Sequence, residues 1–248
     1  MTDKYNLTRK QSVFLAKKLI ADTIYCGIKM EGSKMTFPET QTILDGVNVP
    51  NATLDDIQAI LNMRDAWRYV LETLDEPFSL DYACRVNGFV AGNESLEWGV
   101  LRTGRVGISG TEYVPPIPDR DAADAAIRNL MESQRSVTEK ALAYFAWGAK
   151  SQLFWEGNRR TSLICSNKIL LQEGKGLMSI RESGIKKFNR LLTNYYEETT
   201  GDEHYRNLTS FLYNESMRGI EFENDQKPQE KFSFARNEMV QDQLMEEL

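Results

Sequence analysis

Apolar residues recur at helical spacing along most of this chain. Between residues 57 and 74 they return every three or four positions, which places them on one face of an α-helix. A similar face covers residues 137–150, where alanines favour close helix packing. The pattern therefore predicts a mainly helical protein. Residues of the types that cap helices precede the N-terminal segments: Thr8, Thr36, Thr53 and Ser79.

The same pattern sets the expected helix boundaries. Thr8 opens a helix to about residue 22, and a short second helix is expected over residues 23–32. Thr36 with Glu39 three residues later is a capping-box pattern that opens another helix. Further helices are expected over residues 53–74, 79–91, 121 onward, 137–150, 158–173, 182–196 and 202–217.

Residues 100–118 break the helical pattern. This stretch is rich in Gly, Pro and β-branched residues, and Val106 and Ile108 alternate with small residues before a turn-like sequence at residues 109–111. We expect an isolated β-hairpin that ends at the prolines from Pro115 onward. Such a ribbon either packs on the helices or accepts a strand from a partner at its open edges.

Composition narrows the classes of function. The chain has 248 residues and a formal net charge of −6, which argues against binding to nucleic acid. No apolar run has the length of a membrane span, and no signal-peptide pattern opens the chain, so a cytoplasmic protein with no membrane partner is expected. One histidine and three scattered cysteines make a zinc site unexpected, and the cysteines are predicted to be buried thiols. Homo-oligomer formation stays open.

The most informative stretch for function is residues 152–163, QLFWEGNRRTSL. Gly157 permits a positive φ, and Asn158 is a good cap for the helix that follows. The first turn of a helix offers free N–H groups and the positive end of the macrodipole, which suit a phosphate. Arg160 adds a forked cation, and Glu156 adds a carboxylate for a metal ion that bridges phosphates. Composition alone leaves an ordinary charged helix start as the alternative.

This motif resembles the active-site motif of Fic (Fido) domains, His-x-Phe-x-Asp/Glu-Gly-Asn-Gly-Arg-x-x-Arg. The stretch at residues 104–114 is similar to the family's target-docking flap, and residues 162–171, with Asn167 and Lys168, match the helix after the motif. The resemblance covers roughly residues 20–215. It implies a Fic-type helical bundle with one β-hairpin flap. Residues 1–75 would form an N-terminal helical region with an inhibitory-helix-like segment, residues 76–217 the Fic core and residues 218–248 a polar tail.

The resemblance also implies an activity and a set of roles. Fic proteins typically transfer AMP from ATP, with Mg²⁺, to a hydroxyl of a target protein, which here would dock on the hairpin near residues 104–114. Glu156 would bind the metal, and Gly157 and Asn158 would form the anion hole for the nucleotide phosphates. Arg159 and Arg160 would contact the phosphates, and Arg160 would also serve catalysis.

Three positions depart from the family motif. Gln152 replaces the histidine that takes the proton of the target hydroxyl, and a carboxamide cannot take that proton near neutral pH. Arg159 replaces the second glycine, as a basic residue does in the branch typified by the phage toxin Doc, which transfers phosphate. Leu163 replaces the last arginine.

Glu31 resembles the glutamate of the family's inhibitory helix, whose pattern is Ser/Thr-x-x-x-Glu-Gly/Asn. Glu31-Gly32 fit this pattern, but Gly27 stands in place of Ser or Thr. The usual partner of that glutamate is missing at position 163, so Arg159 or Arg160 would have to replace it. The alternative is an ordinary exposed glutamate before a helix-ending glycine.

Three functions remain in competition. The first is a nucleotide-binding relative of protein adenylyltransferases that is weak or inactive as a standard AMP transferase, and it is favoured because Glu156, Gly157, Asn158 and Arg160 are kept while Gln152 is not. The second is an active transferase of AMP or phosphate with a base other than histidine. The third is an interaction module without a nucleotide.

Overall fold

The computed structural model describes residues 1–50 and 52–220 of the chain, so the polar tail lies outside the described residues from residue 221 onward. Helices dominate, and the predicted mainly helical fold class is confirmed. No helix in the described ranges is both long enough and apolar enough to span a bilayer. The helices are α1 (Arg9–Met30), α2 (Phe37–Leu44), α3 (Leu54–Glu72), α4 (Leu80–Val90), α5 (Arg120–Glu132), α6 (Val137–Ser151), α7 (Asn158–Gln172), α8 (Ile185–Glu197) and α9 (Glu203–Phe211).

The caps predicted from the sequence are present. The backbone N–H of Thr36 donates to the Glu39 carboxylate at 2.8 Å, and the N–H of Glu39 donates back to the Thr36 hydroxyl at 3.4 Å. The side chains of Thr8, Thr53 and Ser79 accept from the first turns of α1, α3 and α4 in the same way. These local bonds satisfy N–H groups that have no partner within their own helix.

One helix, α1, replaces the two helices that we expected over residues 9–32. The Thr23 hydroxyl donates to the carbonyl of Ile20 at 2.8 Å, so the threonine continues the helix instead of breaking it. Gly27 is a point of close packing, because a Cβ there would come within 2.7 Å of Met63 Cε on α3. The chain leaves the helix only after Met30, and Gly32 follows with φ +90°.

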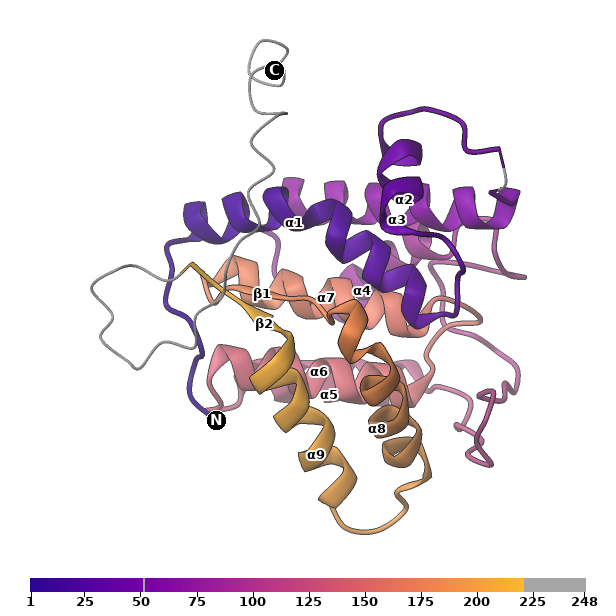
Figure 1. Ribbon diagram of the computed structural model, residues 1–248. Helices are drawn as coiled ribbons and strands as arrows, with labels where there is room; N and C mark the ends of the chain where they lie inside the picture. Colours follow the sequence, from indigo (N-terminus) through magenta and orange to yellow (C-terminus); the bar gives the residue numbers. More distant parts are fainter. Residues whose placement is uncertain (51, 221–248) are drawn as a thin grey trace.

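Helices α6 and α7 run side by side through the middle of the molecule (Figure 1). The N-terminal helices α1, α3 and α4 pack on α7, whereas α9 packs on α6. The two central helices approach closely at Gly148, where an added Cβ would lie 2.6 Å from Ser162 Oγ. That hydroxyl is buried and donates to the carbonyl of Asn158 at 2.7 Å, so it cannot move away freely.

Replacing Gly148 with Ala is expected to lower the free energy of unfolding by about 1–3 kcal/mol, the usual cost of overpacking a close-packed core. In an open helix the same substitution would stabilise by up to about 1 kcal/mol, so the sign of the change reports the contact. Urea unfolding measures it. Gly107→Ala is the control, since nothing in the described part of the chain lies within 4 Å of a Cβ at Gly107. A stabilising Gly148→Ala would contradict close packing at this point.

A small antiparallel sheet pairs β1 (Leu177–Met178) with β2 (Met217–Arg218), with Leu177 opposite Arg218. A short 3₁₀ helix (Glu182–Gly184) leads into α8, and a π-helical turn (Leu212–Ser216) leads from α9 into β2. The sheet therefore ties the end of the helical region back to the segment that follows α7.

The hairpin expected over residues 100–118 is instead a loop without strands, which we call the flap loop. The predicted turn is present, because the N–H of Thr111 donates to the carbonyl of Ile108 at 3.2 Å and Gly110 has φ +81°. In place of a ladder, backbone groups on both sides of the turn bond to side chains. The Arg102 guanidinium donates to carbonyl oxygens of the loop, and the N–H of Glu112 donates to the Glu197 carboxylate at 2.7 Å.

The three cysteines are free and buried, as predicted. Burial raises the pKa of the Cys26 thiol to about 12 and that of the Cys84 thiol to about 11. Burial also raises the pKa of the Cys165 thiol, which sits in the core on α7. These thiols are therefore protonated near neutral pH and act as small apolar groups.

Candidate functional site

Residues 152–157 form the connection between α6 and α7, which we call the motif loop. It begins and ends in the left-handed region, with φ +47° at Gln152 and φ +72° at Gly157. Gly157 is needed for a second reason, because a Cβ there would lie 2.8 Å from the buried Cγ1 of Val90. The backbone therefore turns sharply into α7 against the end of α4.

We expected Asn158 to cap α7, and this prediction is wrong. Gly157 occupies the cap position and Asn158 is the first helical residue. The buried Asn158 carboxamide instead faces back across the loop. It accepts from the N–H of Phe154 at 2.9 Å and donates to the Phe154 carbonyl at 2.8 Å. No side chain among the described residues caps the first turn of α7. Its N–H groups, which have no partners within the helix, are thus left for a ligand.

Two aromatic residues hold the motif loop in place. Phe154 is buried in the core, as expected from its position in the motif. Trp155 is half-buried and packs against Gly104 in the flap loop, where a Cβ would lie 2.4 Å from the ring. The motif loop and the flap loop are therefore in direct contact.

Asn87 on α4 is a site residue that the sequence analysis missed. Its Nδ2 donates to the carbonyl of Glu156 at 3.0 Å and to the Thr161 hydroxyl at 3.2 Å. Its Oδ1 accepts from the N–H of Gly99 at 2.9 Å. The available signal was a polar residue on the apolar face of a helix, since Asn87 is fully buried. Its bonds to neighbours on both sides fix the backbone at Glu156.

Both ends of the Gln152 carboxamide are engaged. Nε2 donates to the carbonyl of Ala149 at 2.7 Å, and Oε1 accepts from Asn158 Nδ2 at 3.1 Å. The side chain therefore closes the end of α6 and supports the motif loop. An amide has no basic lone pair near neutral pH, so this position offers no proton acceptor for a hydroxyl.

Arg102 is a second residue that the sequence analysis did not single out. The residue is only 1% exposed, and its guanidinium donates to four carbonyl oxygens. One of them belongs to Gln152, at 2.6 Å, and the others belong to Gly104, Pro115 and Pro116 at the two ends of the flap loop. Burial among neutral acceptors lowers the pKa of Arg102, which nevertheless stays charged near neutral pH.

The two arginines of the motif are paired with carboxylates. Arg159 pairs with Glu31 at the end of α1, and both side chains are about 30% exposed. Arg160 is buried and pairs with Glu94, a residue the sequence analysis missed because 66 positions separate the two in the chain. Leu163 is 1% exposed in the core, so the family's last arginine is replaced by a packing residue.

Glu156 lies on the surface beside these pairs. Partial burial of its carboxyl group raises its pKa; Arg160 opposes this rise, and the charges of Glu31 and Glu94 add to it. Three carboxylates and two arginines therefore share one end of α7. An added cation at Glu156 would relieve this excess of negative charge.

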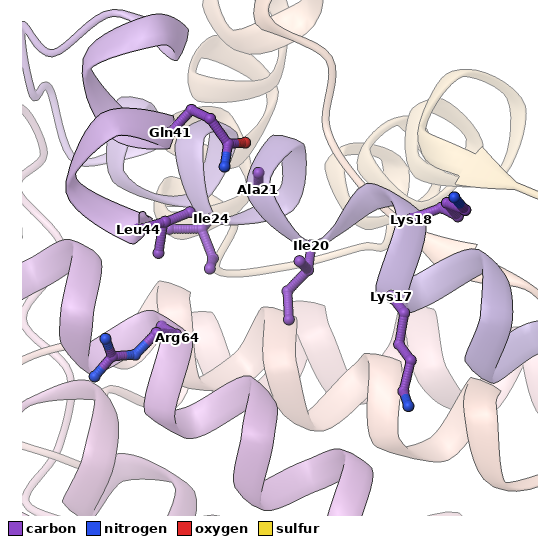
Figure 2. Close-up of a pocket in the computed structure, with 8 residues that line it drawn as sticks. All are labelled: Lys17, Lys18, Ile20, Ala21, Ile24, Gln41, Leu44 and Arg64. Carbon is purple, nitrogen blue, oxygen red and sulfur yellow. The ribbon is translucent and has the colours of Figure 1, made fainter. Parts of the chain in front are cut away.

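Two hollows lie along the N-terminal helices. One, of about 350 Å³, adjoins the motif: Arg160 and Glu94 line it together with Glu31, Asp55 and Asp56. The other, of about 330 Å³, lies between α1, α2 and α3 and is shown in Figure 2. It is lined by Ile20, Ile24 and Leu44, with Lys17 and Arg64 among the polar residues around them, and it shares no residue with the motif loop.

Comparison with known proteins finds relatives of similar sequence and solved structures of similar fold. No family model matches the chain. It is 28% identical over 181 residues to the protein adenylyltransferase Fic of Drosophila yakuba, and 29% identical over 182 residues to that of Drosophila willistoni. These alignments cover 68% of this chain and 36% and 35% of the two relatives, so the chain spans about a third of their length.

Solved structures share the fold. Fic-1 (residues 134–508) of Caenorhabditis elegans superposes with a TM-score of 0.66 at 16% identity, over 81% of this chain and 62% of that one. A Fic domain-containing signalling protein of Bacteroides thetaiotaomicron gives a TM-score of 0.66 at 15% identity, over 84% and 87%. The helical fold of this chain is thus that of Fic domains. In sequence the chain is similar to protein adenylyltransferases named Fic.

Proposed function

We propose that this protein binds the phosphates of a nucleotide at residues 156–160 and that it is weak or inactive as a standard AMP transferase. The observation that carries this proposal is the open start of α7, where Gly157 turns the chain and no side chain of the described ranges caps the first turn. The resemblance to proteins named as protein adenylyltransferases supports ATP as the nucleotide.

The proposed roles follow from the placement of each residue. Gly157 and Asn158 present the first-turn amides to the phosphates, and Asn158 also fixes the loop through its contacts with Phe154. Arg159 is partly exposed and can exchange its contact with Glu31 for a phosphate oxygen. Glu31 would then regulate the site by competing for Arg159. Arg160 contributes charge from a buried position.

Glu156 is the proposed ligand for Mg²⁺. The described residues contain no group of three or more His, Cys, Asp or Glu that could hold a metal by themselves. Mg²⁺ commonly uses one or two carboxylates together with substrate phosphates and water, so one exposed glutamate beside a phosphate site suits it. Mg²⁺ would supply charge neutralisation between the phosphates and the three carboxylates of the site.

The weak activity is proposed from Gln152. In a transfer to a target hydroxyl, a group at this position has to take the proton, and the Gln152 amide is bound at both ends. Loss of a general base costs about 10²–10⁴ in rate, or roughly 3–5 kcal/mol in barrier height. Nucleotide binding does not depend on this group and is retained.

The second candidate is an active transferase of AMP or phosphate with another base. The raised pKa of Glu156, caused first by partial burial, makes its carboxylate a better proton acceptor than an ordinary glutamate. In either case the proposed protein target docks on the flap loop near residues 104–114. Trp155 links that loop to the motif loop through its contact with Gly104.

Titration calorimetry with ATP tests the proposed function. Wild type is expected to bind ATP saturably with Mg²⁺ and more weakly with a chelator. Glu156→Gln is expected to weaken binding of the magnesium complex by on the order of tenfold, because the metal loses its protein ligand. The same substitution leaves metal-free ATP binding unchanged or stronger, since one repulsive charge is gone.

Glu173→Gln is the matched control. Glu173 is exposed at the other end of α7, so the substitution makes the same change in charge far from the phosphate site. Both ATP affinities should stay at the wild-type values. Failure of wild type to bind ATP with or without Mg²⁺ would leave only an interaction module without a nucleotide.

A further inference from the structure

The guanidinium of the buried Arg160 already binds an anion, the carboxylate of Glu94. Nη1 donates to Glu94 Oε1 at 3.1 Å and Nη2 donates to Glu94 Oε2 at 2.6 Å, so the two parallel bonds use both carboxylate oxygens. The side chains of Arg160 and Glu94 are only 7% and 20% exposed. A carboxylate in this arrangement presents two oxygens to the guanidinium as a phosphate would.

Glu94 is held in this position from its other side. Asn62 on α3 donates through Nδ2 to Glu94 Oε1 at 2.8 Å and to the carbonyl of Gly92 at 2.9 Å. Gln58, one turn earlier, donates to Asn62 Oδ1 at 2.7 Å. A line of hydrogen bonds from α3 therefore orients the carboxylate toward Arg160, and little conformational freedom is lost when the pair forms.

The ion pair between Arg160 and Glu94 leaves a phosphate near α7 one unused donor and an acidic surrounding. Arg160 Nε has no hydrogen-bond partner among the described residues, so the guanidinium keeps an unused donor. The neighbouring 350 Å³ hollow is lined by Arg160 and by the carboxylates of Glu94, Glu31, Asp55 and Asp56. Each further negative charge on a ligand in this region meets more repulsion.

We infer that Glu94 is a specificity-determining residue that competes with phosphate for Arg160, and so selects against nucleotides with longer phosphate chains. This inference rests on the proposed nucleotide binding at residues 156–160. Glu94 acts by occupying the bidentate face of Arg160 and by adding a fixed negative charge beside it. Glu31 forms its ion pair with the other arginine, Arg159, so the two carboxylates occupy different guanidinium groups.

The test measures the affinities of AMP, ADP and ATP, each with Mg²⁺, for wild type, Glu94→Gln and Glu97→Gln. Glu97 lies in the same segment and is exposed, and within the described ranges its carboxylate accepts a single long bond, from Trp155 Nε1 at 3.4 Å. Glu97→Gln therefore removes the same charge without touching Arg160. Glu94→Gln is expected to bind ATP about tenfold more tightly than wild type, with smaller gains for ADP and AMP in that order.

Glu97→Gln should stay within about twofold of wild type for all three nucleotides, as expected for an exposed charge. Glu94→Asp keeps the charge but shortens the side chain, so that it loses the two-point contact and should give an intermediate gain for ATP. Thermal unfolding of each variant checks that the proteins are folded. Glu94→Asp also serves if Glu94→Gln does not fold.

The possible outcomes separate the two proposals. Equal ATP affinities in Glu94→Gln and Glu97→Gln, or weaker ATP binding in Glu94→Gln or Glu94→Asp than in wild type, would overturn the role of Glu94 and leave nucleotide binding intact. A gain of the same size for AMP, ADP and ATP would overturn the selection by phosphate number. Absence of binding to every nucleotide in every variant would overturn the proposed function and this inference together.

Discussion

Gln152→His is expected to raise the rate of AMP transfer from ATP to protein by about 10²–10⁴-fold, the usual contribution of a general base. Histidine supplies the missing proton acceptor at the position where the family motif has it. The backbone there suits the substitution, because Gln152 has φ +47° and histidine is among the residues that tolerate the left-handed region. The new rate should increase as the pH rises through about 6.5, where imidazole loses its proton.

Labelled ATP measures this gain, with transfer to the protein itself or to partners in a lysate as the readout. Gln152→Asn is the matched control, since asparagine also tolerates a positive φ and adds no base. It should stay at the wild-type rate. A wild-type protein as active as Gln152→His would show that another group acts as the base, and the second candidate function would replace the first.

Arg102→Ala is expected to lower the free energy of unfolding by about 3–4 kcal/mol, near the upper end for single substitutions. The truncation removes charged hydrogen bonds to four carbonyl oxygens and leaves several of them without a partner in the interior. It also empties the space of a fully buried side chain. The flap loop and the Gln152 carbonyl lose their shared anchor, so both loops should become accessible to proteases.

Urea unfolding and limited proteolysis within residues 100–118 measure the effect. Arg105→Ala is the control, because Arg105 lies in the same loop and carries the same charge but is exposed. Its free energy of unfolding should change by less than about 0.5 kcal/mol. Similar losses for the two variants would mean that the burial of Arg102 does not stabilise the flap loop.

Features set by neighbours in sequence were predictable. The caps at Thr36, Thr53 and Ser79 are confirmed because each cap and its partner lie within three residues of one another. The continuous α1 was not predicted, because the packing of Gly27 on Met63 involves a helix far along the chain. The predicted hairpin was wrong; within it, the Gly104 carbonyl bonds to the Arg102 side chain and the Glu112 N–H bonds to the distant Glu197 side chain.

In the candidate site, too, features within the motif were predictable and contacts with distant residues were not. The spacing of the motif placed Glu156, Gly157 and Arg160 at one helix end, and the structure brings them together there. The motif could not reveal Glu94, because the ion pair with Arg160 joins segments 66 positions apart. Nor could it reveal that the Asn158 carboxamide faces back to Phe154, since the same residue type serves equally well as a cap.

The contacts that shape the motif loop come from groups that do not titrate between about pH 5 and 8. Asn87, Asn158 and Gln152 contribute carboxamides, and Arg102 contributes a guanidinium that stays charged throughout this range. These hydrogen bonds are therefore expected to persist across this range of pH. Dependence of ligand affinity on acidity is therefore expected to come from carboxylates such as Glu156, which lies in the loop itself, or from the ligand.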